Sequence, residues 1–324
     1  MTILITGVAG FIGNQVALKL LTRGENVIGI DNLNNYYDTK LKENRLNRLK
    51  GFDKFKFLKE NIASKNLFSS LEKYSDINRI IHLAAQAGVR YSISNPHNYV
   101  ESNLVGHLNI LEYARSKKNL KNLVYASSSS VYGGNTKIPF SVKDNVDKPI
   151  SLYAATKKSD ELLSYSYSHL FGINQVGLRF FTVYGPWGRP DMALFLFTDS
   201  IMKGNPIKIF NYGNMSRDFT YIDDIVNGTV SAMDKCPAKN DKIPHRVYNL
   251  GNDKPEKLVK LIELIEYHTG KKAIRKLESM QLGDVQNTLA DIEESKQDLD
   301  FYPKIKIEEG VPLFIDWYRE YFKL

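Results

Sequence analysis

The sequence predicts an α/β fold with a doubly wound parallel sheet, and three observations support this prediction. Six short apolar runs recur along the first 180 residues, and segments with helical spacing of apolar residues separate them. Runs that are apolar along their whole length are typical of strands buried on both faces of a parallel sheet. A glycine-rich turn directly follows the first run. Strands and helices that alternate in this order form a parallel sheet through right-handed crossovers.

The expected elements follow one another regularly until about residue 180. The predicted strands are 3–5, 27–30, 55–58, 80–83, 123–126 and 175–178, and the predicted helices are 14–22, 98–116 and 153–171. Proline and glycine then cluster at 184–190, and the later elements are shorter. We expect one more strand–helix pair to return to the sheet at 221–233, and further helices at 258–269 and 311–322.

Composition excludes several classes of protein. The chain has 324 residues, 43% hydrophobic and 25% charged, and it is long enough to bury a core without disulfides or metals. Its single cysteine, Cys236, forms no intrachain disulfide, and no Cys/His cluster has the spacing of a metal site. We therefore expect a reducing compartment and no bound metal.

Nucleic acids and membranes are not expected as partners. The net charge of +8 comes from basic residues scattered along the chain, whereas a nucleic-acid-binding face usually shows clustering. No apolar stretch reaches the roughly 18 residues that a membrane-spanning helix needs. The first residues enter a strand-like run without the pattern of a secretory signal, so the expected location is the cytoplasm.

A glycine motif follows the first expected strand. Gly7, Gly10 and Gly13 permit a tight turn and let a pyrophosphate approach the N-terminus of the next helix, where free N–H groups and the helix dipole favour anions. The second expected strand ends in Asp31, whose carboxylate accepts hydrogen bonds from an adenosine ribose and repels a 2′-phosphate. The pattern therefore predicts NAD, in preference to NADP, as the cofactor.

A tyrosine and a lysine one helical turn apart form the second motif. An ammonium at the position of Lys157 stabilises the phenolate of Tyr153. The same spacing recurs at Tyr36/Lys40, Tyr113/Lys117, Tyr267/Lys271 and Tyr302/Lys306, so spacing alone identifies nothing. Only Tyr153 comes after a strand that ends in serines, at 127–130, and ligands of open α/β sheets bind at the carboxyl ends of strands. We expect Ser128 to act with Tyr153 and Lys157; the alternative for the serines is a plain polar turn.

The chain resembles the extended short-chain dehydrogenase/reductases, a family of nucleotide-sugar epimerases and dehydratases with a Rossmann-type fold. The matching motifs are GxxGxxG at 7–13, HLAAQ at 82–86, YASSSSVYG at 125–133, YxxxK at 153–157 and RDFTYIDD at 217–224. More narrowly, it is similar to the UDP-glucuronate 4-epimerases in DNLNNYYD at 31–38, HLAAQAGVRYS at 82–92, SLYAATKK at 151–158, RFFTVYGPWGRPDMALFLF at 179–197 and QLGDVQNTLAD at 281–291.

The resemblance implies NAD-dependent interconversion of UDP-glucuronate and UDP-galacturonate. Tyr153 would take the proton from the sugar 4-OH while hydride leaves C4 for the nicotinamide. The 4-keto intermediate would then rotate and receive the hydride on its other face. Lys157 would hold the nicotinamide ribose, and Ser128 would orient or relay the proton.

The resemblance also implies which residues surround the two ligands. Around NAD they are Gly7, Gly10, Phe11, Ile12, Gly13, Asp31, Asn32, Asn61, Ile62, Leu83, Ala84, Ala85, Gln86, Asn103, Tyr153, Lys157 and Phe180. Asn103 resembles a position that either contacts ligand or holds an active-site backbone in place. Around the UDP-sugar they are Ser128, Ser129, Ser130, Tyr153, Thr182, Arg189, Phe210, Arg217 and Asp284. Arg217 would contact the diphosphate, Asp284 the uridine ribose and Phe210 the uracil. Asn61 stands where family members commonly have aspartate, and its carbonyl can still accept a hydrogen bond from the adenine amino group.

The residue types favour an acidic sugar. The segment 128–130 has no carboxylate, so it lacks the acid/base group that dehydrating or decarboxylating relatives use and does not repel an anion. Ser129, Ser130, Thr182 and Arg189 would suit a C6 carboxylate, since arginine pairs with carboxylates bidentately. The alternatives are a 4-epimerase of a neutral or N-acetylated UDP-hexose, a UDP-glucuronate decarboxylase and an NAD-binding scaffold protein without activity.

Two domains and a homodimer complete the expectations. Residues 1–182, with a returning segment at about 221–250, form the Rossmann-type NAD-binding domain, and 183–220 with 251–324 form a smaller, interleaved nucleotide-sugar-binding domain. Relatives often dimerise through helices that correspond to 98–116 and 153–171. The apolar residues expected to point outward from these helices are Leu108, Leu111, Leu163 and Leu170.

Overall fold

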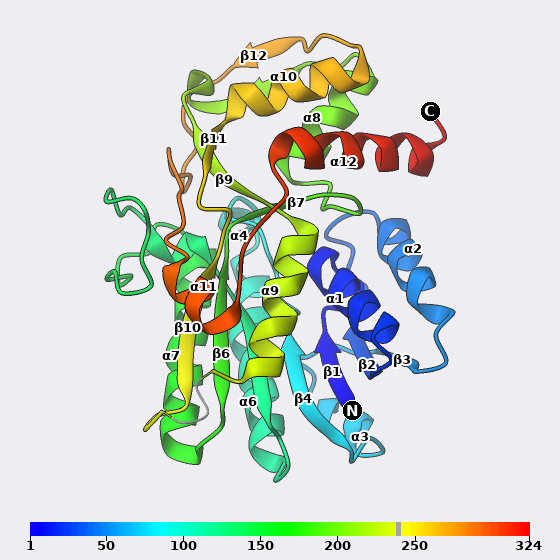
Figure 1. Ribbon diagram of the computed structural model, residues 1–324, viewed down its shortest axis with the longest axis vertical. Helices are drawn as coiled ribbons and strands as arrows, with labels where there is room; N and C mark the ends of the chain where they lie inside the picture. Colours follow the sequence, from blue (N-terminus) through cyan, green and yellow to red (C-terminus); the bar gives the residue numbers. More distant parts are fainter. Residues whose placement is uncertain (238–240) are drawn as a thin grey trace.

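Seven parallel strands form the central sheet of the protein (Figure 1). The computed structural model describes residues 1–237 and 241–324. In spatial order the strands are β10 (His245–Leu250), β6 (Gln175–Phe180), β5 (Asn122–Ser128), β4 (Ile77–His82), β1 (Thr2–Thr6), β2 (Asn26–Asp31) and β3 (Phe55–Lys59). Every pair of neighbours is parallel, which confirms the predicted fold class.

Helices cover both faces of this sheet, because alternate side chains of each strand point to opposite faces. Ile3 and Ile5 of β1 belong to one hydrophobic cluster, and Leu4 belongs to the other; all three are fully buried. The first cluster includes residues of α1 (Phe11–Thr22) and α9 (Ile222–Lys235), and the second includes residues of α3 (Leu67–Leu71) and α6 (Gly106–Ser116). Burial on both faces is why these strands are apolar along their whole length.

The strand order reverses at the centre of the sheet. From β1 the chain moves outward through β2 and β3, and it then crosses to the other side of β1 and continues through β4, β5 and β6. The connections after β1 and β4 therefore run in opposite directions and leave a crevice at the carboxyl ends of these strands. In open α/β sheets, this crevice is where ligands bind.

Helix α7 (Leu152–Phe171) carries the predicted Tyr–Lys pair beside the crevice. It begins after Ser151, whose side-chain oxygen accepts the Ala154 N–H at 3.1 Å, as an N-capping serine does. It ends at Gly172, whose φ of 65° lies in the left-handed region that glycine adopts without strain.

The single helix predicted over 98–116 is interrupted. The structure has α5 (Pro96–Tyr99), a π-helical segment η1 (Val100–Val105) and then α6. Asn103, in the π-helical segment, is buried and bonds to both backbone groups of Gln86. A π-helical turn is frequent near functional sites, and hydrophobic periodicity does not predict it.

A second group of elements lies above the main sheet in Figure 1. It contains a three-stranded sheet of β11 (Pro255–Lys257), β9 (Ser216–Tyr221) and β7 (Thr182–Tyr184), a two-stranded sheet of β12 (Arg275–Leu277) and β8 (Ile207–Ile209), and the helices α8 (Ala193–Met202), α10 (Leu258–Thr269) and α12 (Ile307–Phe322). The remaining elements are α2 (Thr39–Lys50), α4 (Tyr91–Ser94), α11 (Glu293–Leu299) and the 3-10 turns η2 (Ser129–Tyr132) and η3 (Phe210–Gly213).

The prediction that a strand–helix pair returns to the sheet at 221–233 is right for the helix and wrong for the strand. Helix α9 does pack beside the sheet, but the strand before it, β9, pairs with β7 and β11 in the smaller sheet. The place beside β6 is taken by β10, which pairs with all six residues of β6. Of the predicted returning segment 221–250, residues 238–240 lie outside the described residues.

Gly29 in β2 has no room for a side chain. A Cβ atom there would lie 2.7 Å from Val8 Cγ1 and 2.9 Å from Phe55 Cε2. We expect Gly29→Ala to lower the free energy of unfolding by about 1–3 kcal/mol through overpacking, seen as a lower urea midpoint. Gly51→Ala is the matched control, because nothing lies within 4 Å of its added Cβ and its φ is −74°. Equal midpoints for the two variants would contradict this packing argument.

Candidate active site

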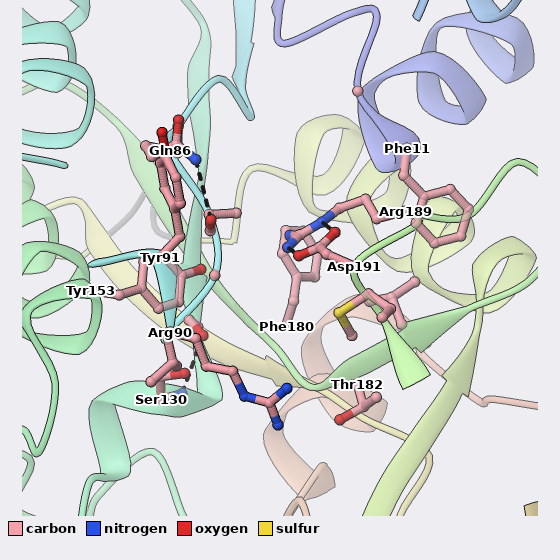
Figure 2. A pocket seen from close by; sticks show the side chains of 18 of the residues that line it. Phe11, Gln86, Arg90, Tyr91, Ser130, Tyr153, Phe180, Thr182, Arg189 and Asp191 are labelled. Carbon is pink, nitrogen blue, oxygen red and sulfur yellow. Dashed lines mark hydrogen bonds and ion pairs between the residues drawn. The ribbon is translucent and has the colours of Figure 1, made fainter. Parts of the chain in front are cut away.

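A cavity of about 1000 Å³ opens at the carboxyl ends of the sheet strands and extends beneath the upper elements (Figure 2). Among the residues predicted to contact NAD or the UDP-sugar, all but Asn103 line this cavity. In Figure 2, Tyr153 and Ser130 lie on one side of the cavity and Thr182 and Arg189 lie across from them. One continuous space therefore joins the glycine turn, the Tyr–Lys pair and the residues predicted to contact the UDP-sugar.

The glycine turn is packed so tightly that two of its glycines have no room for a side chain. A Cβ on Gly7 would lie 2.8 Å from the Ala84 backbone nitrogen, and one on Gly13 would lie 2.2 Å from the Gly7 carbonyl oxygen. Gly10, the N-cap of α1, lines the cavity; among the described residues no side chain caps this helix, and its first turn has no acidic residue. The positive end of the helix dipole therefore faces the cavity, which suits the pyrophosphate of a dinucleotide.

Asp31 is held at the end of β2 by two backbone donors. Its Oδ2 accepts the Ala9 N–H at 3.0 Å, and its Oδ1 accepts the Leu33 N–H at 2.9 Å. Burial raises the pKa of Asp31, while these N–H groups and Lys42 act in the opposite direction. A carboxylate has about four acceptor positions, so Asp31 keeps capacity for two ribose hydroxyls.

The predicted catalytic residues come from two adjoining elements. Ser128 is the last residue of β5, and its hydroxyl oxygen accepts the Ser130 N–H at 3.1 Å. Tyr153 lies in the first turn of α7, with its ring centroid 6.1 Å from that of Tyr99. Lys157 follows one turn later and donates from Nζ to Asp160 Oδ2 at 2.7 Å. Hydroxyl, phenol and ammonium groups thus line one wall of the cavity.

Arg189 is already paired with a carboxylate. Its Nε donates to Asp191 Oδ1 at 3.0 Å, and its Nη2 donates to Asp191 Oδ2 at 2.5 Å (Figure 2). The Tyr36 hydroxyl also donates to Asp191 Oδ2, at 3.0 Å. Burial lowers the pKa of Arg189, but Asp191 more than offsets this and the net effect is a raised pKa. The pair fixes the guanidinium at the edge of the cavity.

Two arginines meet one carboxylate at the far end of the cavity. Arg217 of β9 and Arg90 lie 3.5 Å and 3.4 Å from different oxygens of Asp284. The Arg90 guanidinium also lies 4.8 Å from the centroid of the Phe210 ring. Two guanidinium groups with one counter-ion leave an excess positive charge, as a diphosphate site requires.

Comparison with known proteins identifies the family. The model of the NAD dependent epimerase/dehydratase family matches residues 3–251. The chain belongs to this family. Similar relatives include Protein CapI of Staphylococcus aureus, 49% identical over 100% of both chains, and UDP-glucuronate 4-epimerase 2 of Arabidopsis thaliana, 44% identical over 100% of this chain and 77% of the plant protein. The crystal structure of UDP-glucuronic acid 4-epimerase from Bacillus cereus with UDP-glucuronic acid and NAD has a TM-score of 0.91 and 34% identity, covering 99% of this chain and 100% of that one.

Family membership confirms the resemblance predicted from the motifs, and with it the expectation of NAD as cofactor. The residues present fit that cofactor, because the N-terminus of α1 at the glycine turn and the fixed carboxylate of Asp31 both line the cavity. In the part of the chain that the structure describes, no cluster of His, Cys, Asp and Glu could hold a metal ion. None of the helices described there is long and apolar enough to cross a membrane.

Asn103 stands apart from the other residues predicted to contact NAD. It does not line the cavity, because its side chain bonds inward to the Gln86 backbone and, at 2.9 Å, to the Thr156 hydroxyl. Asn103 therefore holds Gln86, which does line the cavity. Asn61 lines the cavity, and its side-chain oxygen accepts the Ala63 N–H at 3.0 Å.

Sequence reasoning missed several charged residues at the cavity or beside it, and four of them pair with site residues or face the ligands. They are Lys42, Arg90, Asp160 and Asp191. Arg90 and Asp191 lie within quoted motifs, at 82–92 and 179–197, so a search of those motifs for charges would have found them. Lys42 and Asp160 carry no such signal, because their positions depend on how a helix packs.

Asp31 gives a direct test of the dinucleotide end. We expect Asp31→Asn to weaken NAD binding about tenfold, because hydrogen bonds to a charged acceptor become bonds to a neutral one. The preference for NAD over NADP should also narrow, since the charge that repels a 2′-phosphate is gone. Calorimetric titration of nucleotide-free protein measures both effects, with the exposed Asp53→Asn as control. Unchanged affinities for both nucleotides would show that Asp31 does not contact the ribose.

Proposed function

We propose that the protein interconverts UDP-glucuronate and UDP-galacturonate by NAD-dependent epimerisation at C4. The observation that carries the proposal is one cavity lined by the glycine turn, by Ser128, Tyr153 and Lys157, and by Arg189. Relatives named UDP-glucuronate 4-epimerase, 44% identical to this chain, support it. The four serines at 127–130, without a carboxylate, disfavour dehydration or decarboxylation.

The residues of the catalytic wall have separate roles in this proposal. Tyr153 takes the proton of the sugar 4-OH and returns a proton when the alcohol re-forms. Ser128 donates to or accepts from the same oxygen, and Lys157 stabilises the phenolate and holds the nicotinamide ribose. Bound NAD supplies the reversible hydride acceptor that inversion at C4 needs.

The sugar carboxylate is held by Ser129, Ser130, Thr182 and Arg189. The 4-keto form of a glucuronate is a β-keto acid, and it loses carbon dioxide when the carboxylate aligns with the carbonyl π-system. Hydroxyl donors on one wall and a guanidinium on the other hold the carboxylate out of that alignment. The same contacts select an acidic sugar over a neutral one.

The remaining contacts belong to the UDP group. Arg217 and Arg90 face the diphosphate, Asp284 the uridine ribose and Phe210 the uracil. Three of them, Phe210, Arg217 and Asp284, fall within 183–220 or 251–324, which supports the division into an NAD-binding domain (1–182 with 221–250) and a nucleotide-sugar-binding domain (183–220 with 251–324). A protein that uses both small molecules and has one cysteine fits a cytoplasmic location.

We also propose a homodimer that packs α6 and α7 of one subunit against those of another. Exposed apolar side chains on this side of the molecule are Val100, Val105, Leu108, Leu162, Tyr165, Leu170 and Phe171. Two of the expected outward residues need correction. Leu111 is fully buried because it faces the sheet, and Leu163 is partly buried against the same core.

A proton NMR time course tests the proposed function. Purified protein with NAD and UDP-glucuronate should produce the anomeric signal of UDP-galacturonate and no pentose signal. UDP-glucose and UDP-N-acetylglucosamine, offered separately, should react at least about tenfold more slowly, since they lack the group that Arg189 binds. Conversion of a neutral sugar but not of UDP-glucuronate would contradict the proposal.

Arg189→Ala tests the carboxylate site. We expect kcat/KM for UDP-glucuronate to fall about 10- to 100-fold, the value of a charged hydrogen-bonded pair. A UDP-pentose should also appear, because the freed carboxylate can align and be lost. Arg275→Ala removes an exposed arginine of β12 and serves as control. Unchanged efficiency with no pentose would show that Arg189 neither binds nor protects the carboxylate.

A further inference from the structure

Lys157 has a buried carboxylate as its neighbour on α7. Its Nζ donates to Asp160 Oδ2 at 2.7 Å, and the two side chains are only 4% and 1% exposed. The other oxygen, Asp160 Oδ1, has no hydrogen-bond partner among the described residues. A carboxylate in such a place is costly to bury, and a buried ion pair is a weak source of stability. Its presence beside the proposed catalytic lysine therefore calls for a role in the chemistry.

We propose that Asp160 is a positioning residue that sets how strongly Lys157 stabilises the phenolate of Tyr153. The carboxylate holds the ammonium on the side of α7 that faces the cavity, and one donor bond leaves two N–H groups for a ribose. It also opposes the positive field that the ammonium exerts on the phenol. The proposal rests on the roles of Tyr153 and Lys157 in the proposed function.

Among the described residues, Lys157 is the only cation that pairs with Asp160. His107 of α6 and Tyr125 of β5 face it, but burial lowers the pKa of His107 to about 3 and raises that of Tyr125. Both are therefore neutral near pH 7. Glu161, the next residue on α7, is paired with Arg179 of β6 at 2.8 Å. His82 of β4 lies within electrostatic reach of Lys157, but burial lowers the pKa of this histidine as well, so it too is neutral.

The other titratable groups on elements that pack against α7 contact different partners. Tyr91 of α4 contacts Tyr36, Tyr99 of α5 contacts Tyr153, and His97 of α5 is exposed. Glu101 of η1 lies 3.5 Å from Asn61, and Tyr132 of η2 lies against Arg179. On α6, Glu112 pairs with Arg115, and the Tyr113 ring lies under the Lys117 ammonium. On β10, His245 bonds to Tyr125, and Arg246 and Tyr248 both bond to Asp298.

The charge state of Asp160 suits this role. Burial raises its pKa to about 6, with Lys157 acting in the opposite direction. A carboxyl group is the anion above its pKa, so Asp160 is charged in the neutral and alkaline range. The opposition to the lysine field is present there and is lost as the pH falls through about 6.

The test is the pH profile of kcat/KM for 4-epimerisation of UDP-glucuronate by the NAD-loaded protein. Asp160→Asn keeps the shape and an acceptor oxygen for Lys157 but removes the charge. We expect its acid limb to move about one unit to lower pH, because the unopposed ammonium stabilises the phenolate more strongly. Asp160→Glu, which keeps the charge, should retain a limb close to that of the unaltered protein. Glu263→Gln, which removes an exposed charge of α10, is the control.

The outcomes separate this inference from the proposed function. A limb that moves in Asp160→Asn but not in Glu263→Gln supports it. The inference is overturned if Asp160→Asn lowers activity at every pH while its acid limb stays in place, or if that limb moves to higher pH. Asp160→Ala is interpreted in the same way if Asp160→Asn does not fold, as judged by circular dichroism. If Tyr153→Phe retains full activity, the proposed role of Tyr153 is wrong. That result refutes the proposed mechanism and not the role of Asp160 in particular.

Discussion

A buried ion pair joins the three elements on which the candidate active site depends. Arg179 of β6 donates to both carboxylate oxygens of Glu161 on α7, at 2.8 Å and 2.9 Å, and the Ser127 hydroxyl of β5 donates to the same carboxylate at 2.6 Å. The next residue of β5 is Ser128, and Tyr153 and Lys157 lie on α7. The pair therefore fixes the serine wall relative to the tyrosine, and loss of one partner would leave a buried charge unpaired.

Each cation predicted to contact a ligand already has a carboxylate partner within the protein. Lys157 pairs with Asp160, Arg189 with Asp191, and Arg217 with Asp284. These pairs keep long side chains in fixed positions before a ligand arrives, which lowers the entropy that binding costs. They also reduce the net positive charge of the cavity, so selectivity for an acidic sugar depends on geometry as well as on charge.

Short sequence motifs predicted the structural features that are determined by residues close together in the chain. The glycine turn, the six sheet strands and the Tyr153–Lys157 pair are of this kind, because strand burial and helical spacing are visible in short segments. The partners of these residues were not predictable in the same way. Tyr36 and Asp191 are 155 positions apart, yet they meet in one network with Arg189. Likewise, the place of β9 depended on β10 occupying the position beside β6.

The fate of the C4 hydrogen distinguishes the proposed hydride transfer from other routes to inversion, because hydride that leaves C4 for bound NAD and returns to it does not exchange with water. UDP-glucuronate carrying deuterium at C4 would be converted in ordinary water, and the UDP-galacturonate formed would be examined by NMR and mass spectrometry. The product should keep its deuterium at C4, with the configuration of that carbon inverted. A product with solvent hydrogen at C4, or deuterium released to water, would contradict it.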